Sequence, residues 1–302
     1  MIAGYLIDSN ATASPVLRAP GTEPIYLPVS VLLETYKHAN IPRSVEESFG
    51  FLRSAPDRVH VLRDFGSLSQ HEIRTAHILT VADVVDQRTT AKIRQALSAG
   101  IGSFHDRHQD IIQRIKHRQE TLRHGLLNTD TNRIIASDID GNLLARIPDQ
   151  LRQPYRVRSR SAWLNDPIDK DLVEAAVFTA RREMHSFLVR RGFPRTQRDW
   201  LVRKNPLLFR ALAIGFVRRF VNESGNTMAN WQRNPSQQEF TNERIDLDVC
   251  ALSSLFRIAI TNDTKNRICL RYLHRIMEIN RRTVLTPTRI VYAETPTATR
   301  PS

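Results

Sequence analysis

Two apolar segments, one near each end of the chain, both lead into an aspartate. Residues 2–7 read as a buried strand that is followed by Asp8, and residues 257–260 read as a strand that is followed by Thr261 and then Asp263. Parallel strands of an open α/β sheet present their carboxyl ends to a common crevice, where such proteins bind ligands. We therefore expect both carboxylates at one edge of one sheet, so the first and last parts of the chain must fold together.

The periodicity of apolar residues divides the chain into three segments and a short tail. Residues 1–85 and 206–295 alternate short strand and helix patterns, whereas residues 86–205 are mostly helical and strongly charged. We therefore expect an α/β core with a central parallel sheet, built from both terminal parts, and a mostly α-helical basic insertion between them. The tail at 296–302 is expected to be disordered.

Helix start signals recur along the chain. Pro28 with Ser30 marks one helix, which runs to about Lys37, and capping boxes begin at Ser44 and Ser69. Apolar periodicity adds further expected elements. It predicts helices over 104–124, 169–191, 206–220, 247–256 and 264–279, and strands near 59–62 and 288–293.

Four carboxylates occupy places from which they can converge on one site. Glu34 and Asp246 lie on or at the start of short apolar helices, and Asp8 and Asp263 follow strands. Each acid alone could be a loop residue or a helix cap, but four converging carboxylates repel one another unless a cation neutralises them. Mg²⁺ and Mn²⁺ prefer such oxygen ligands. Asp246 is preferred to Asp248 as the third ligand because it precedes the apolar helix.

These residues lie in segments that resemble the motifs of PIN-domain ribonucleases. YLIDSN is similar to the family's first motif, LPVSVLLETYKH to the second, and RIDLDVCALSSLFRIAITND to the third and fourth. The resemblance implies a three-layer α/β fold and an endoribonuclease that needs Mg²⁺ or Mn²⁺. A long insertion between the second and third motifs departs from the usually compact family. The implied metal ligands and catalytic residues are Asp8, Glu34, Asp246 and Asp263, with Asn10 and Thr261 as supporting residues.

The positive charge of the chain predicts a polyanionic partner. The chain has a formal net charge of +13, and much of it comes from arginine, which suits bidentate phosphate contacts. On the expected helix over 169–191, we predict that Arg181, Arg182, Arg190 and Arg191 form a basic wall near the acidic cleft and bind RNA, or single-stranded DNA as a second choice. A solvated surface, or a basic helix lying on a membrane, remains an alternative.

Cysteine usage and hydropathy indicate the compartment. Cys250 and Cys269 are the only cysteines, both in apolar surroundings, which predicts reduced core residues and a cytoplasmic protein. No apolar stretch is long enough to span a bilayer, and the N-terminus lacks signal-peptide features. The sequence does not decide whether the protein has a protein inhibitor or a complex partner, nor what its oligomeric state is.

Other signals support competing functions. The segment RIIASDIDGNLL resembles the first motif of haloacid-dehalogenase-type phosphatases, which would make Asp138 the nucleophile and Asp140 the acid/base. Asn142 departs from that motif, and a β-hairpin or turn built on Asp-Gly inside the insertion is the favoured interpretation of the segment. His105 and His108 share a helix face but lack a third ligand. A catalytically silent module that binds RNA or a protein partner is the remaining alternative.

Overall fold

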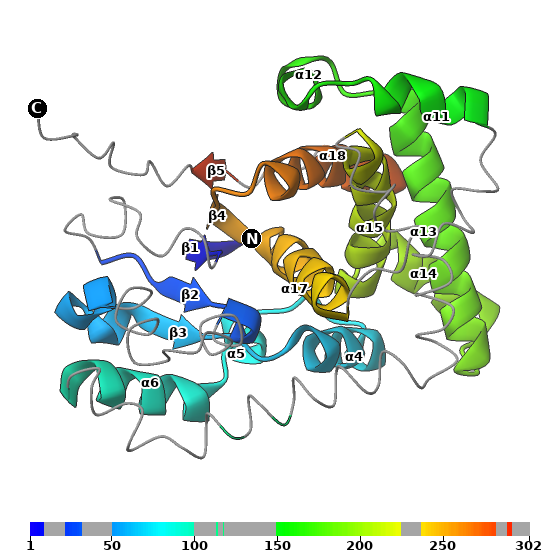
Figure 1. The fold of residues 1–302 in the computed structure, drawn as a ribbon. Helices are drawn as coiled ribbons and strands as arrows, with labels where there is room; N and C mark the ends of the chain where they lie inside the picture. The colour runs from blue at the N-terminus through cyan, green and yellow to red at the C-terminus, as the bar shows by residue number, and fades with distance from the viewer. Residues whose placement is uncertain are drawn as a thin grey trace, which may run out of the picture.

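The computed structural model describes residues 1–8, 22–31, 50–99, 113, 117, 149–224, 237–281 and 289–291. Within these ranges the protein is a mixed α/β structure around one parallel sheet (Figure 1). The sheet has the strand order β3-β2-β1-β4-β5. Its strands are β1 (Ile2–Ile7), β2 (Ile25–Leu27), β3 (Val59–Val61), β4 (Phe256–Ile260) and β5 (Arg289–Val291).

The central strand joins the two ends of the chain. Strand β1 pairs in parallel with β2 on one side and with β4 on the other. The prediction that both terminal parts build one parallel sheet is therefore confirmed. Strand β1 also requires Gly4, whose φ of +113° is unfavourable for other residues. A Cβ atom at Gly4 would lie 2.6 Å from the Pro24 carbonyl oxygen and 2.8 Å from the Tyr26 ring.

Helices flank the sheet and extend away from it. Helix α6 packs against β3, and α17 packs against β4, while α15 contacts α4, α13, α17 and α18. None of the helices in the described ranges is long and apolar enough to cross a membrane. The α-helices are α4 (Phe65–Thr75), α5 (Val81–Val84), α6 (Gln87–Ala99), α11 (Asp149–Arg156), α12 (Arg160–Asn165), α13 (Lys170–Arg190), α14 (Arg195–Arg203), α15 (Leu207–Glu223), α17 (Gln237–Ser253) and α18 (Thr264–Arg281), and η2 (Gly50–Ser54) and η3 (Pro56–Arg58) are 3-10 helices.

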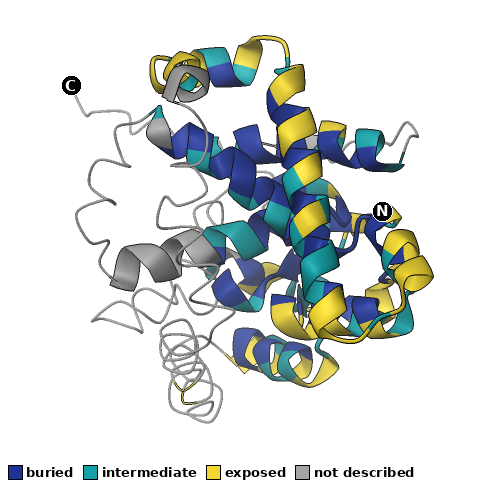
Figure 2. Cartoon of the chain, turned by 90° about the vertical axis from the view of Figure 1, so that its right-hand side faces the viewer, coloured by how far each residue is buried: buried dark blue, intermediate teal, exposed yellow. Residues whose placement is uncertain are grey.

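One apolar core runs through the sheet and the helices. Helix α13 falls in the segment predicted as an insertion, yet its apolar face shares this core with α15, α18 and the sheet. Figure 2 shows the buried residues gathered between the elements and the exposed ones on the outer faces. Cys250 and Cys269 are buried free thiols, as predicted. Burial, together with the neighbouring Cys269, raises the pKa of the Cys250 thiol, which suits a structural role for Cys250.

Two helix starts differ from the sequence-based expectation. Helix α4 begins at Phe65, because Asp64 accepts a hydrogen bond from the Ser67 amide at 2.9 Å and caps the helix earlier than the predicted start at Ser69. Helix α17 begins at Gln237, so the helix predicted over 247–256 is longer and Asp246 lies in its interior. The polar first half of α17 carries too few apolar residues for periodicity to detect.

A buried carboxyl on α4 caps a second helix. Glu72 accepts a hydrogen bond through Oε2 from the amide of Leu207, the first residue of α15, at 2.6 Å. The residue before it, Pro206, offers no side-chain cap. Burial raises the pKa of Glu72, although the Arg210 charge and the Leu207 amide oppose this shift. Glu72 therefore links the packing of α4 to the start of α15.

We expect the Glu72→Gln variant to gain stability relative to the wild type as the pH rises. Because the pKa of Glu72 is raised on folding, the wild type loses unfolding free energy as the pH rises from below 4.5 through the folded pKa. Glutamine keeps the acceptor for Leu207 but does not titrate. Urea unfolding at several pH values between 4 and 7 measures this difference. The exposed Glu174→Gln is the control, and a difference for Glu72→Gln that stays flat or falls with pH would contradict the assignment.

Candidate functional site

Asp8 is a buried carboxylate at the carboxyl end of the central strand. It directly follows β1, it is 3% exposed, and its amide donates a hydrogen bond to the Ile260 carbonyl at the end of β4. Its Oδ2 accepts a hydrogen bond from Thr261 Oγ1 at 2.6 Å and another from Asn266 Nδ2 at 3.0 Å. Parallel pairing of β1 and β4 produces this meeting, because both strands end at the same edge.

Asp263 directly precedes helix α18 (Thr264–Arg281) and shares the Thr261 hydroxyl with Asp8. Its Oδ1 accepts hydrogen bonds from the amides of Lys265 at 2.6 Å and Asn266 at 3.2 Å, which is the geometry of a helix cap. Its own amide donates to Thr261 Oγ1 at 3.0 Å. One hydroxyl, that of Thr261, therefore connects Asp8 with the backbone of Asp263, which agrees with the predicted supporting position of Thr261.

A buried arginine ties a third acid to this pair. Arg218 on α15 is 2% exposed, and its Nη2 donates to Asp246 Oδ2 on α17 at 2.7 Å. Its Nη1 donates to Asn266 Oδ1 at 2.7 Å. Since Asn266 also donates to Asp8, hydrogen bonds run from Asp246 through Arg218 and Asn266 to Asp8. We call these residues the acidic network: Asp8, Asp246, Thr261, Asp263, Asn266 and Arg218.

The acidic network has the donor chemistry of a hard-cation site. The acidic network contains three carboxylates and one guanidinium, that of Arg218, which pairs directly with Asp246, so acidic groups outnumber the basic group by two. Oxygen donors with excess negative charge suit Mg²⁺ or Mn²⁺. In the described part of the chain, however, no three acids, histidines or cysteines are placed to hold a metal ion together. Asp246 is already engaged in the ion pair with Arg218, which leaves Asp8 and Asp263 as the two candidate ligands of the network.

Two of the predicted site residues cannot be placed. Glu34 and Asn10 lie outside the described residues, as do Asp138, Asp140 and the two histidines of the weaker motifs.

Asp248 is two positions beyond Asp246 on α17, and residues two apart on a helix point to different sides. The ion pair with Arg218 ties Asp246 to the network.

The predicted nucleic-acid-binding arginines lie on and just after α13. Arg182 pairs with Glu183 at 2.8 Å, while Arg190 and Arg191 are exposed. Arg181 donates to Asn280 near the end of α18, whereas Asn266 of the network lies in its first turn. These two asparagines are 280 − 266 = 14 residues apart, which is about 21 Å along a helix. Arg181 therefore does not border the acidic network.

Sequence reasoning missed the two residues that connect the network. Arg218 directly follows the apolar run AIGFV of α15, and a charge next to such a run is a signal for a buried ion pair. Because Arg219 is adjacent, the sequence alone does not tell which of the two arginines is buried. Asn266 is three positions after Asp263, in the first helical turn, and its role depends on contacts with Asp8 and Arg218 that are distant in the chain.

The comparisons with known proteins found no matching family model, no matching curated protein and no matching solved structure.

Proposed function

We propose that the chain is a divalent-metal-dependent nuclease of the PIN type that hydrolyses phosphodiester bonds in RNA. One observation carries the proposal. Asp8 and Asp263 come from opposite ends of the chain, meet at the carboxyl edge of a parallel sheet, and are both bonded to the hydroxyl of Thr261. Their order and positions agree with the motifs that resemble the PIN family.

The residues have distinct proposed roles. Asp8 and Asp263 would hold the Mg²⁺ or Mn²⁺ ion, and Glu34 would complete the ligand set. Thr261 and Asn266 orient the Asp8 carboxylate through hydrogen bonds of 2.6 and 3.0 Å. The bound cation would lower the pKa of a coordinated water and stabilise negative charge on the phosphoryl group.

Positive charge supports RNA as the substrate. The net charge of +13 favours a polyanion, and the exposed Arg182, Arg190 and Arg191 would contact backbone phosphates. Such binding weakens as the salt concentration rises. A cytoplasmic location remains part of this proposal, and a protein inhibitor or complex partner would be compatible with it.

Cleavage of labelled single-stranded RNA tests the proposal. We expect cleavage with Mg²⁺ or Mn²⁺, none with a chelator, and a loss of at least about tenfold in Asp263→Asn, which keeps a capping side chain but loses a charge. Asp138→Asn should cleave like the wild type. If Asp138→Asn instead abolishes hydrolysis of a phosphomonoester and Asp263→Asn does not, the phosphatase reading replaces the nuclease.

A catalytically silent RNA-binding module is the second candidate. The observation that favours it is the Arg218–Asp246 ion pair, which satisfies one predicted metal ligand within the protein itself. Such a module would bind RNA equally well with and without a divalent ion and would not cut it. The same cleavage assay, combined with binding in the presence of a chelator, separates the two.

A further inference from the structure

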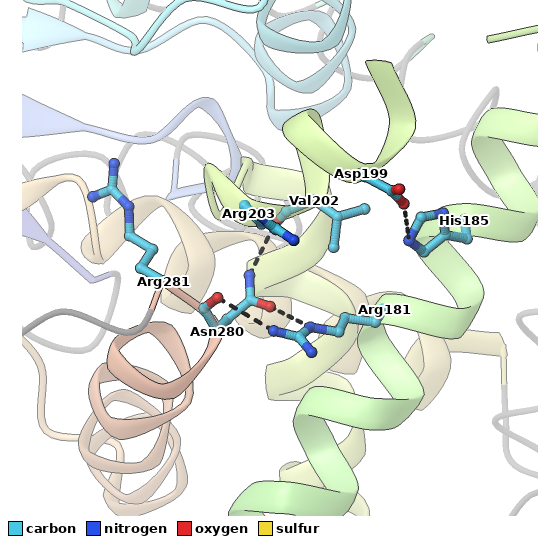
Figure 3. Close-up of a pocket in the computed structure, with 7 residues that line it drawn as sticks. All are labelled: Arg181, His185, Asp199, Val202, Arg203, Asn280 and Arg281. Atoms are coloured by element: carbon cyan, nitrogen blue, oxygen red, sulfur yellow. Dashed lines mark hydrogen bonds and ion pairs between the residues drawn. The ribbon is translucent and has the colours of Figure 1, made fainter. Parts of the chain in front are cut away.

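A second polar site lies at the far end of α18, between this helix, α13 and α14. A cavity of about 270 Å³ opens there (Figure 3). Asn266 of the acidic network and Asn280 of the cavity lie about 21 Å apart along α18, at 1.5 Å per residue, so the two sites are separate. The cavity is lined by Arg181, His185, Asp199, Val202, Arg203, Asn280 and Arg281.

One wall of the cavity is fixed by a buried asparagine. Asn280 is 2% exposed, and its Nδ2 donates to the Val202 carbonyl at 2.7 Å and to Asn205 Oδ1 at 2.6 Å. Its Oδ1 accepts from Arg181 Nε at 2.6 Å, and its carbonyl accepts from Arg181 Nη2 at 3.3 Å. Figure 3 shows Arg181 directed at Asn280 from α13. The Arg181 guanidinium is therefore held in one orientation beside the cavity.

The other two arginines leave positive charge uncompensated. Arg203 is exposed and Arg281 is half-buried, and neither makes a hydrogen bond or ion pair with any residue that the structure describes. Desolvation lowers the pKa of the half-buried Arg210, the Glu72 charge opposes this shift, and the Arg281 charge adds to it, so the Arg210 and Arg281 guanidiniums act on each other. The acid of the cavity, Asp199, lies 3.4 Å from His185 Nε2.

Helix ends do not account for all of this charge. Arg203 ends α14 and Arg281 ends α18, and a base in the last turn stabilises a helix terminus. Each C-terminus carries roughly half a negative charge, so the two ends offset about one of the three guanidinium charges. Asp199 offsets at most one more. A net positive charge is left at the cavity, where Asn280 holds Arg181 in place.

We propose that this cavity binds the phosphate group of a phosphomonoester, with Arg203 and Arg281 as the principal donors and Arg181 as an orienting neighbour. Guanidinium groups match phosphate oxygens in bidentate pairs, and a dianion matches the excess charge. The volume is close to the lower end of ligand pockets, about 300 Å³, which suits a phosphate with a small attached group. The phosphate belongs either to a free mononucleotide-sized molecule or to the 5′ end of an RNA. The site does not depend on nuclease activity.

Calorimetric titration of the full chain with adenosine 5′-monophosphate and with inorganic phosphate tests this site. We expect the wild type to bind both, and the Arg203→Ala/Arg281→Ala variant to lose at least about tenfold in affinity, which is what losing charged hydrogen bonds typically costs. The control, Arg74→Ala/Arg88→Ala, removes the same charge from exposed positions on α4 and α6 that lie outside the cavity lining, and it should bind within about twofold of the wild type. The single variant Arg203→Ala changes an exposed residue, so it keeps the test valid if the double variant unfolds.

Two further binding measurements identify the kind of molecule that carries the phosphate. A short oligoribonucleotide with a 5′-phosphate that binds better than its 5′-hydroxyl counterpart indicates an RNA end. Equal binding of the two oligonucleotides, with retained binding of the mononucleotide, indicates a free small molecule. If the wild type binds neither phosphate compound, or if both double variants weaken binding equally, the cavity is ordinary basic surface and the proposal is wrong.

Discussion

Replacing Asp8 with asparagine is expected to reduce RNA cleavage at least about a hundredfold, since even second-shell changes at metal sites cost about 10- to 100-fold. The asparagine oxygen can still accept the hydrogen bonds that Thr261 and Asn266 donate at 2.6 and 3.0 Å. The change therefore removes the negative charge, and with it a hard-cation ligand, while the local packing stays. Relief of repulsion from Asp246 and Asp263 offsets part of any lost stability in the metal-free protein.

Initial cleavage rates and thermal unfolding measured on one preparation test this expectation. Asp57→Asn is the matched control, because Asp57 is exposed and the chemical change is identical. We expect Asp57→Asn to cleave like the wild type, and both variants to unfold near the wild-type temperature. Wild-type cleavage by Asp8→Asn would remove Asp8 from the mechanism, and an unfolded Asp8→Asn would assign the carboxylate a structural role.

Replacing Arg218 with methionine is expected to lower the free energy of unfolding by about 3–5 kcal/mol, the usual cost of removing one partner of a buried ion pair. Arg218 is 2% exposed and bonds both Asp246 and Asn266 at 2.7 Å. Without it, three carboxylates of the acidic network lose their internal counter-charge and repel one another more strongly. Methionine fills similar volume, so the loss reports charge and hydrogen bonding more than a cavity.

Urea unfolding measures this loss, and Arg219→Met provides the comparison. Arg219 is the next residue on α15 and is only half-buried, so its replacement should cost clearly less. Adding Asp246→Leu to Arg218→Met should recover part of the stability, because it removes the carboxylate left without its partner. Mg²⁺ should stabilise Arg218→Met more than the wild type. Equal losses at Arg218 and Arg219, with no recovery in the double variant, would contradict the proposed network.

The aspartates that follow strands were predictable, because strand ends are visible in a single sequence. Asp8 and Asp263 follow apolar runs, and parallel pairing of β1 with β4 brings them to one edge as expected. The contacts that organise them were not predictable. Asn266 and Asp8 are far apart in the chain, and only the packing of α15 against α18 brings Arg218 to Asn266.

The arginine-lined cavity shows another limit of sequence reasoning. Its walls are the ends of α14 and α18 and the middle of α13, so no local pattern marks it. The sequence predicted that Arg181 and Arg182 both belong to the basic wall, because both lie on the polar side of an amphipathic pattern. In the fold, Arg181 is held by Asn280, whereas Arg182 is exposed beside Glu183. Whether an arginine of the predicted basic wall is held in place or exposed therefore depends on which neighbouring residue it contacts in the fold.

Direct measurement of Mn²⁺ binding tests the central claim, that the acidic network is a divalent-cation site. Electron paramagnetic resonance follows the signal of free Mn²⁺ as protein is added. We predict that the wild type removes Mn²⁺ from solution, that excess Mg²⁺ releases it, and that Asp8→Asn binds Mn²⁺ much more weakly while Asp57→Asn binds like the wild type. A wild-type protein that leaves the free Mn²⁺ signal unchanged, or an Asp8→Asn protein that binds Mn²⁺ equally well, would contradict the account.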